Sequence, residues 1–206
     1  MNITAEVFLK MFSEKTQNDC CISTKDNKNI SFINFYKYED GVTSTEFTEY
    51  MNKNLISNIV QQLCGNVSHE YYRIDTTGWV SKEIDDLKEL TGKHKLNYHC
   101  WDLKISVEHE NDQKDWLDEV VKLAHIRCPL KIVIGYNFCD KRENECEELL
   151  NQVALPILKQ VDAFSSNEPD DFLIIFGNMK HNGISYKSAD YRGYLYNYQF
   201  KKFERI

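Results

Sequence analysis

The stretch Tyr98–Asn111, YHCWDLKISVEHEN, joins an apolar segment to a pair of carboxylates, and it decides the fold. Side chains alternate between the two faces of a β-strand with a period of two residues. A strand over this stretch therefore projects Glu108 and Glu110 from the same face. Its opposite face is apolar and suited to a core, with Trp101, Leu103, Ile105 and Val107.

Two neighbouring carboxylates repel each other, and burying them without a partner is unfavourable. A divalent cation removes this repulsion, because carboxylate oxygens on a rigid strand are the hard ligands that bind Mg²⁺ or Mn²⁺. The alternative is that Glu108 and Glu110 lie on the solvated polar face of an edge strand. The choice between the two interpretations depends on the rest of the chain.

The composition predicts a soluble globular protein. The chain has 206 residues, of which 42% are hydrophobic and 28% charged, so one domain with a sizeable core is expected. It has no apolar run of the length that spans a membrane, and its first residues do not resemble a secretory signal. The net charge of −7 argues against non-specific binding of nucleic acid over the whole surface, although a local basic groove is compatible with it.

The cysteines predict a reducing compartment. There are seven, an odd number, and no two of them form a Cys-x-x-Cys pair. We interpret them as reduced, mostly structural thiols of a cytoplasmic protein rather than as metal ligands.

Helical periodicity and capping residues predict five helices. Thr4 is expected to cap the first, Ser44 or Thr45 the second, and Asn111 or Asp112 the fourth. In the last helix Pro156 is expected to cause a kink or a break. The predicted ranges are 2–13, 44–64 (ended by Gly65), 81–91, 112–126 (ended by Pro129) and 143–163.

The remaining segments read as strands and loops. Aromatic and β-branched residues, or short continuous apolar runs, favour strands. A turn is expected at Asp40–Gly41, and a bulge or break at Gly78. The predicted strands are 30–38, 67–80, 98–111, 130–136, 170–177 and 191–203, the last as a hairpin partner of 171–177, with polar loops at 17–29 and 178–190. The fold class is therefore a single mixed α/β domain over residues 1–206.

A third acid belongs with the carboxylate pair. Asp75 lies inside the predicted strand 67–80, where aspartate is uncommon. Asp75, Glu108, Glu110 and the backbone carbonyl of His109 could together supply oxygens for one face of an octahedral cation site. Lys122 lies on the helix that follows and is suited to stabilising a phosphoryl group or helping to deprotonate water, although an exposed helix lysine is the plainer alternative.

Four segments resemble the PD-(D/E)xK, or restriction endonuclease-like, nuclease superfamily. They are YRIDTTGW at 72–79, WDLKISVEHEN at 101–111, WLDEVVKLAH at 116–125 and LKIVIGY at 130–136. Their order is similar to that family's core of helix, strands, helix and strand. The resemblance covers about residues 44–138 and implies a central mixed β-sheet flanked by helices, with a C-terminal helix and hairpin at 143–206 added to it.

The resemblance also implies roles for particular residues. Asp75 and Glu108 take the positions of the family's first and second acids. The third position is usually lysine and here is Glu110, a departure that leaves the general base open, while some members move the lysine to the following helix, where Lys122 stands. The family often adds an acid on the preceding helix, where Glu49 is the first candidate and Glu46 the second.

Three functions are compatible with these residues. The first is a nuclease or phosphodiesterase that uses Mg²⁺ or Mn²⁺ to hydrolyse nucleic acid, with DNA as the first substrate to test. The second is a non-catalytic member of the same fold that binds nucleic acid or a protein. The third is an interaction protein of another α/β fold, whose glutamates are solvated. A homodimer or a partner protein is compatible with each of them.

Overall fold

The computed structural model of the chain describes residues 3–26, 28–81, 92–94, 101–138, 142, 144–164, 170–178 and 188–206. The helix predicted at 81–91 and most of the loop predicted at 178–190 lie outside these residues. So do the first residues of the strand predicted at 98–111.

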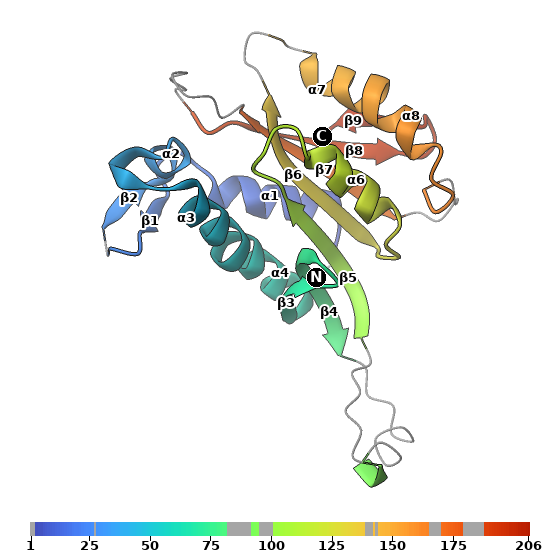
Figure 1. Ribbon diagram of the computed structural model, residues 1–206, viewed down its shortest axis with the longest axis horizontal. Helices are drawn as coiled ribbons and strands as arrows, with labels where there is room; N and C mark the ends of the chain where they lie inside the picture. The colour runs from blue at the N-terminus through green and yellow to red at the C-terminus, as the bar shows by residue number, and fades with distance from the viewer. Residues whose placement is uncertain are drawn as a thin grey trace.

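A mixed seven-stranded sheet in the order β3-β4-β5-β6-β7-β8-β9 forms the centre of the molecule (Figure 1). The three central strands β5, β6 and β7 are parallel, and the strands on either side of them pair antiparallel. The chain is therefore of mixed α/β type. The strands are β3 (Asn66–Tyr71), β4 (Ile74–Ser81), β5 (Trp101–His109), β6 (Leu130–Phe138), β7 (Asp171–Asn178), β8 (Tyr191–Asn197) and β9 (Lys202–Arg205).

Helices cover both faces of this sheet (Figure 1). Helices α1, α3 and α4 pack on one face, and α6, α7 and α8 pack on the other. Two π-helical segments, η2 and η3, continue directly from α3 and α7. The bounds are α1 (Ala5–Lys15), α2 (Phe32–Tyr36), η1 (Glu39–Gly41), α3 (Ser44–Glu49), η2 (Tyr50–Ile56), α4 (Ser57–Cys64), α6 (Trp116–Ala124), α7 (Glu145–Glu148), η3 (Leu149–Ala154) and α8 (Leu155–Leu158).

Strand β6 separates two hydrophobic cores. Ile132 and Ile134 point into the core under α1, α3 and α4, whereas Val133 points into the core under α6 and α8. A strand that is buried on both faces is mainly apolar, which explains why the runs at 130–136 and 170–177 predicted their strands correctly. The buried Lys131 on β6 is paired with Asp170.

The two N-terminal helix predictions are confirmed with small changes. Thr4 caps α1 as expected, its hydroxyl accepting a hydrogen bond from the backbone N–H of Val7. The helix predicted at 44–64 is capped by Thr43 rather than by Ser44 or Thr45, and it ends at Gly65, whose φ of 82° suits glycine. Within it, the geometry changes from α to π over η2.

The predictions for 17–29 and 30–38 are wrong. The first segment is not only a loop, because β1 (Cys21–Ser23) pairs antiparallel with β2 (Asn29–Ser31). The second is helix α2 after residue 31 rather than a strand. Phe32, Phe35 and Tyr36 are spaced as on one helix face and are all buried, and this period outweighs the β propensity of aromatic residues.

The strand predicted at 67–80 is instead a hairpin of β3 and β4. Its turn residues Tyr72 and Arg73 have φ values of 51° and 63°. Two-residue hairpin turns with positive φ usually contain Asn or Gly, and Tyr72 and Arg73 are neither, so no turn could be predicted here. The predicted irregularity at Gly78 is confirmed as a register shift against β5. A Cβ atom on Gly78 would lie 2.4 Å from Cγ1 of Val60, so the glycine lets α4 approach the sheet.

The later helices are shorter than predicted. Helix α6 begins at Trp116 instead of residue 112, with Asp115 at its N-cap, and it ends at Ala124, well before Pro129. The helix predicted at 143–163 is α7, η3 and α8, which together end at Leu158. Pro156 lies at the start of α8, directly after the π-helical segment. The interruption expected at this proline is therefore a change from π-helical to α-helical geometry.

The strand predicted at 191–203 is two strands, β8 and β9. Strand β8 pairs antiparallel with β7, which confirms the expected partner. The turn before β9 is held by Asn197, whose Oδ1 accepts hydrogen bonds from the N–H groups of Gln199 and Phe200. Among the described residues, no helix is both long enough and apolar enough to span a membrane.

Candidate functional site

Asp75 and Glu108 lie beside each other on neighbouring strands. Strands β4 and β5 are antiparallel, so the first residues of β4 meet the last residues of β5. The backbone N–H of Asp75 lies 3.4 Å from Oε2 of Glu108, and the N–H of His109 donates to Oδ2 of Asp75 at 2.9 Å. The strand pairing thus brings these two acids together, as the sequence predicted.

Glu108 is buried, so it does not lie on the solvated face of an edge strand. Its exposure is 1%, and β5 lies between two other strands. Burial raises the pKa of Glu108 to about 8, and the charges of Asp75 and Glu119 act in the same direction, while the bond to Lys122 opposes them. Burial also raises the pKa of Asp75 above the ordinary aspartate value, against the effect of its bond from His109.

Helix α6 brings Lys122 to this carboxylate pair. The buried side of the helix, which includes Val120 and Leu123, packs on the sheet and turns Lys122 toward β5. Its ammonium nitrogen lies 2.7 Å from Oε1 of Glu108, forms a second ion pair with Glu119, and donates to the backbone carbonyl of Arg73 at 3.1 Å. Burial lowers the pKa of Lys122, but its bonds to the two glutamates outweigh burial and raise it overall. Lys122 is therefore not a free surface lysine.

Glu110 lies just beyond β5 and is held by the backbone. Its N–H donates to the carbonyl of Ile134 at 2.9 Å, and its Oε1 accepts from the N–H of Asp112 at 2.6 Å. Its side chain is half-buried, and burial raises its pKa. Asp112, which was expected to cap α6, instead belongs to this turn.

His109 points away from the acids, as its position in the strand predicted. Its Nε2 lies 2.7 Å from the hydroxyl of Tyr136, and its ring packs near Phe47 in the core on the opposite face of the sheet. The backbone N–H of His109 therefore binds Asp75 in the site, while its side chain packs in the core.

These residues line a cavity of about 590 Å³, which we call the acidic cavity. Glu108, Glu110 and Lys122 all face it. Within the described part of the chain, however, no three His, Cys, Asp or Glu side chains are grouped so as to hold a metal ion. The expected set of three carboxylates is thus not assembled, and Asp75 and Glu108 remain as the adjoining pair. The lining residues are Thr48, Asn52, Glu70, Arg73, Asp75, Glu108, His109, Glu110, Asn111, Glu119 and Lys122.

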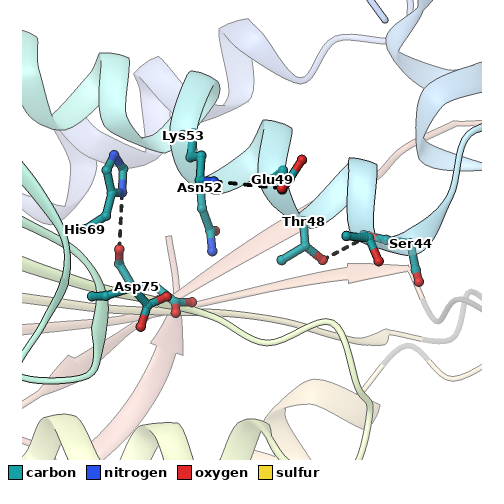
Figure 2. A pocket seen from close by; sticks show the side chains of 9 residues that line it. Ser44, Thr48, Glu49, Asn52, Lys53, His69 and Asp75 are labelled. Atoms are coloured by element: carbon teal, nitrogen blue, oxygen red, sulfur yellow. Dashed lines mark hydrogen bonds and ion pairs between the residues drawn. The ribbon is translucent and has the colours of Figure 1, made fainter. Parts of the chain in front are cut away.

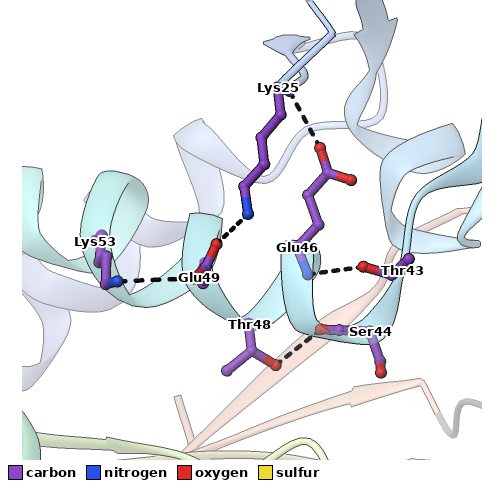
Figure 3. A network of polar contacts seen from close by, with 7 residues as sticks. All are labelled: Lys25, Thr43, Ser44, Glu46, Thr48, Glu49 and Lys53. Carbon is purple, nitrogen blue, oxygen red and sulfur yellow. Dashed lines mark hydrogen bonds and ion pairs between the residues drawn. The ribbon is translucent and has the colours of Figure 1, made fainter.

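Glu49 lies outside the acidic cavity. It faces a second cavity of about 410 Å³, which Figure 2 shows from close by. Figure 3 shows that Glu49 is paired with Lys25 and Lys53, while Glu46 accepts a hydrogen bond from the N–H of Lys25. The bond from Lys25 lowers the pKa of Glu49. The charge of Glu49 is therefore balanced by lysines, and Glu49 does not join Asp75 and Glu108.

Several site residues were not predicted from the sequence. Glu119 could have been found, because it precedes Lys122 by three residues and so lies on the same face of α6. No such signal pointed to Thr48 on α3, to Asn52 on the π-helical segment or to Glu70 beside the β3–β4 turn.

The fold and the site together define a mixed α/β protein in which a buried glutamate, an adjoining half-buried aspartate and a lysine lie at one end of the sheet. Comparisons with models of known protein families, with curated proteins and with solved structures find no match for this chain.

Proposed function

We propose that this protein hydrolyses phosphodiester bonds in nucleic acid with the help of Mg²⁺ or Mn²⁺. The observation that carries the proposal is the adjoining pair of the half-buried Asp75 and the buried Glu108, with Lys122 bound to Glu108 at the wall of the acidic cavity. Acids with raised pKa values in a cavity, beside a lysine, are typical of catalytic sites.

The two acids are suited to one hard cation. Mg²⁺ is commonly held in enzymes by one or two carboxylates, with water and substrate phosphate as its other ligands, so a third protein carboxylate is not required. Asp75 and Glu108 would hold it, because burial and the charges of neighbouring acids raise the pKa values of both carboxyls, and a bound cation would offset the repulsion between them. When bound between these two residues, the cation would lower the pKa of a water molecule and offset negative charge on the phosphate.

Two further residues act beside the acid pair. Lys122 brings a positive charge and N–H donors to the cavity wall, where they favour the binding of a phosphate oxygen. Glu110 occupies the usual lysine position of the resembled family and faces the same cavity. Because its half-buried carboxylate faces this cavity and burial raises its pKa, we assign it as the general base.

The arrangement of the elements supports the resemblance to restriction endonuclease-like nucleases. The chain passes from α3 and α4 through β3, β4 and β5 to α6 and β6, with β6 parallel to β5. This is the order of helix, strands, helix and strand that the resemblance implies. The positions of Asp75 on β4, Glu108 on β5 and Lys122 on α6 agree with the roles transferred to them.

The experiment is a cleavage assay on plasmid DNA, single-stranded DNA and RNA with Mg²⁺, Mn²⁺ or EDTA. We expect cleavage that requires the cation, and a loss of at least about 100-fold in Glu108→Gln, because the variant removes a cation ligand and keeps the side-chain shape. Glu147→Gln, at an exposed position on α7, is the matched control and should keep the wild-type rate. A Glu108→Gln protein that cleaves as fast as the wild type would contradict the proposal.

The second candidate function is a cytoplasmic protein of the same fold that binds nucleic acid or a protein without cleaving it. Lys122 favours it, because this lysine already neutralises Glu108 without a metal ion, and Glu110 stands where the resembled family usually has lysine. Cation-dependent cleavage that is lost in Glu108→Gln would exclude this second function.

A further inference from the structure

The second cavity adjoins the acidic cavity. It lies between the α3–η2 helix and the β3–β4 hairpin, and Asp75 faces the helix across it (Figure 2). Thr48, Asn52, Glu70 and Asp75 line both cavities. Its volume of about 410 Å³ is in the range of pockets that enclose small ligand groups. A nucleic acid whose phosphate lies at Asp75 and Glu108 therefore has a neighbouring pocket within reach.

The chemistry of this second cavity differs from that of the acidic cavity. The charges of Glu49 and Lys53 are paired with each other, and Lys25 is also paired with Glu49 (Figure 3). Apart from the acids Glu70 and Asp75, the remaining lining is neutral and polar, including the hydroxyls of Ser44, Thr45 and Thr48 and the amide of Asn52. Such a lining favours a neutral ligand group with hydrogen-bonding edges over a second phosphate.

Asn52 is the residue that points to a ligand. Its Oδ1 atom is buried and accepts no hydrogen bond from any residue that the structure describes. Buried polar atoms nearly always have a partner, and leaving one without a partner destabilises the folded chain. Asn52 also lies on the π-helical segment, where the Ser57 hydroxyl bonds to its backbone carbonyl, and such segments are frequent at functional sites.

A wall beside Asn52 is already fixed in place. The Nε2 atom of His69 lies 3.1 Å from the hydroxyl of Ser57, and its Nδ1 lies 3.4 Å from the backbone carbonyl of Asp75. The imidazole therefore links η2–α4 to the strand that carries the catalytic acid. Neither contact uses the amide of Asn52.

We propose that the second cavity receives one unstacked nucleobase of the substrate, next to the phosphate at Asp75 and Glu108. A carboxamide presents an acceptor and a donor side by side, which matches a base with an amino group beside a ring nitrogen, namely adenine or cytosine. A base inside a duplex is stacked and cannot enter such a pocket. The substrate is therefore single-stranded at this nucleotide. This inference rests on the proposed function and specifies its substrate.

The test is the binding of fluorescein-labelled single-stranded DNA of ten identical nucleotides, followed by fluorescence anisotropy with Ca²⁺ in place of Mg²⁺. The wild type should bind the adenine and cytosine strands several-fold more tightly than the thymine strand. Asn52→Leu should weaken binding of the adenine strand about tenfold, the effect of about one hydrogen bond, and should remove the preference between bases. Asn54→Leu is the matched control, because Asn54 is exposed two residues away on η2, and it should bind like the wild type.

Thermal unfolding distinguishes a ligand contact from a structural role. Replacing a buried acceptor that has no partner by an apolar group is neutral or stabilising, so the Tm of Asn52→Leu should equal or exceed that of the wild type. Weaker binding together with an unchanged or higher Tm supports the inference. A fall in Tm, or wild-type binding by Asn52→Leu, overturns it.

The two proposals fail in different ways. If cleavage is lost in Glu108→Gln while Asn52→Leu binds and discriminates bases like the wild type, the inference is wrong and the proposed function stands. If the wild type binds none of the three strands, nor RNA strands of the same bases, both are overturned.

Discussion

At the scale of single residues, Glu108 determines the electrostatics of the site. Its carboxylate is buried, and the nearest positive charge is Lys122, which it shares with Glu119. One lysine thus offsets several acids, and the acids keep raised pKa values despite it. The folded chain therefore carries an electrostatic cost at this point whenever Glu108 is ionised.

This cost predicts how stability depends on pH. An ordinary glutamate has a pKa of 4.5, and folding raises that of Glu108 to about 8, so the folded chain holds this proton more tightly than the unfolded chain does. The contribution of Glu108 to the free energy of unfolding is therefore highest below pH 4.5 and falls as the pH rises to about 8. The total loss is on the order of 4 kcal/mol.

Urea unfolding in EDTA at several pH values between 5 and 8 measures this effect. Glu108→Gln does not titrate at this position, so its stability should rise relative to the wild type at each step toward pH 8. Glu147→Gln should follow the wild type at every pH. A stability difference between wild type and Glu108→Gln that does not change with pH would show that Glu108 has an ordinary pKa.

The sequence predicted the meeting of Asp75 and Glu108 because it depends only on strands that pair in chain order. It did not predict the bond of Glu110 to Asp112, because β5 ends at His109 and the alternation of faces ends with it. Nor could it predict Asn52, since the π-helical segment changes which side chains of the helix share a face.

At the scale of elements, the β3–β4 hairpin links the strand of Asp75 to Lys122. Lys122 donates to the backbone carbonyl of Arg73, which lies in the turn. Tyr72 and Arg73 both have positive φ, a conformation that favours Gly and Asn over residues with large side chains. Tyr72 is also 78% exposed, so burial of its ring does little to offset this strain.

The double variant Tyr72→Asn with Arg73→Gly should therefore stabilise the chain. Asn and Gly suit positive φ, and the backbone carbonyl that binds Lys122 is kept. We expect a gain of about 1–2 kcal/mol in the free energy of unfolding, measured by urea denaturation. Lys114→Gly is the control, because Lys114 lies in a turn without positive φ, and it should bring no gain. A double variant that is no more stable than the wild type would mean that the turn is not strained.

Elements with strong periodicity were predicted well, and elements set by turns were not. Apolar residues at helical spacing predicted the helix at 44–64. Short continuous apolar runs predicted the strands at 130–136 and 170–177. The β3–β4 turn and helix α2 were missed because aromatic residues stand where a turn residue or a helix former is expected. In α2 the burial of Phe32, Phe35 and Tyr36 outweighs local propensity, whereas the exposed residues of the β3–β4 turn have no such packing.

At the scale of the whole molecule, an aromatic cluster joins distant parts of the chain behind the site. Tyr136 on β6 packs against Tyr36, Phe47 and Tyr191, and its hydroxyl lies at hydrogen-bond distance from His109. The N-terminal helices, the central strand and the C-terminal strands thus meet around one ring. Because His109 also holds Asp75 through its backbone, this cluster supports the end of β5 from the opposite face of the sheet.

A substitution at Gly177 on β7 tests whether the aromatic cluster is rigid. A Cβ atom there would lie 2.8 Å from the ring of Tyr136 and 2.9 Å from that of Tyr191, and neither ring can move without disturbing its neighbours. Gly177→Ala should therefore lower the free energy of unfolding by about 1–3 kcal/mol through overpacking, with a Tm lower by several degrees. Gly92→Ala is the matched control, because a Cβ there meets nothing within 4 Å, and it should leave the Tm nearly unchanged. If Gly177→Ala unfolds at the wild-type temperature, the rings have room to adjust, and the aromatic cluster cannot be the rigid support of the site.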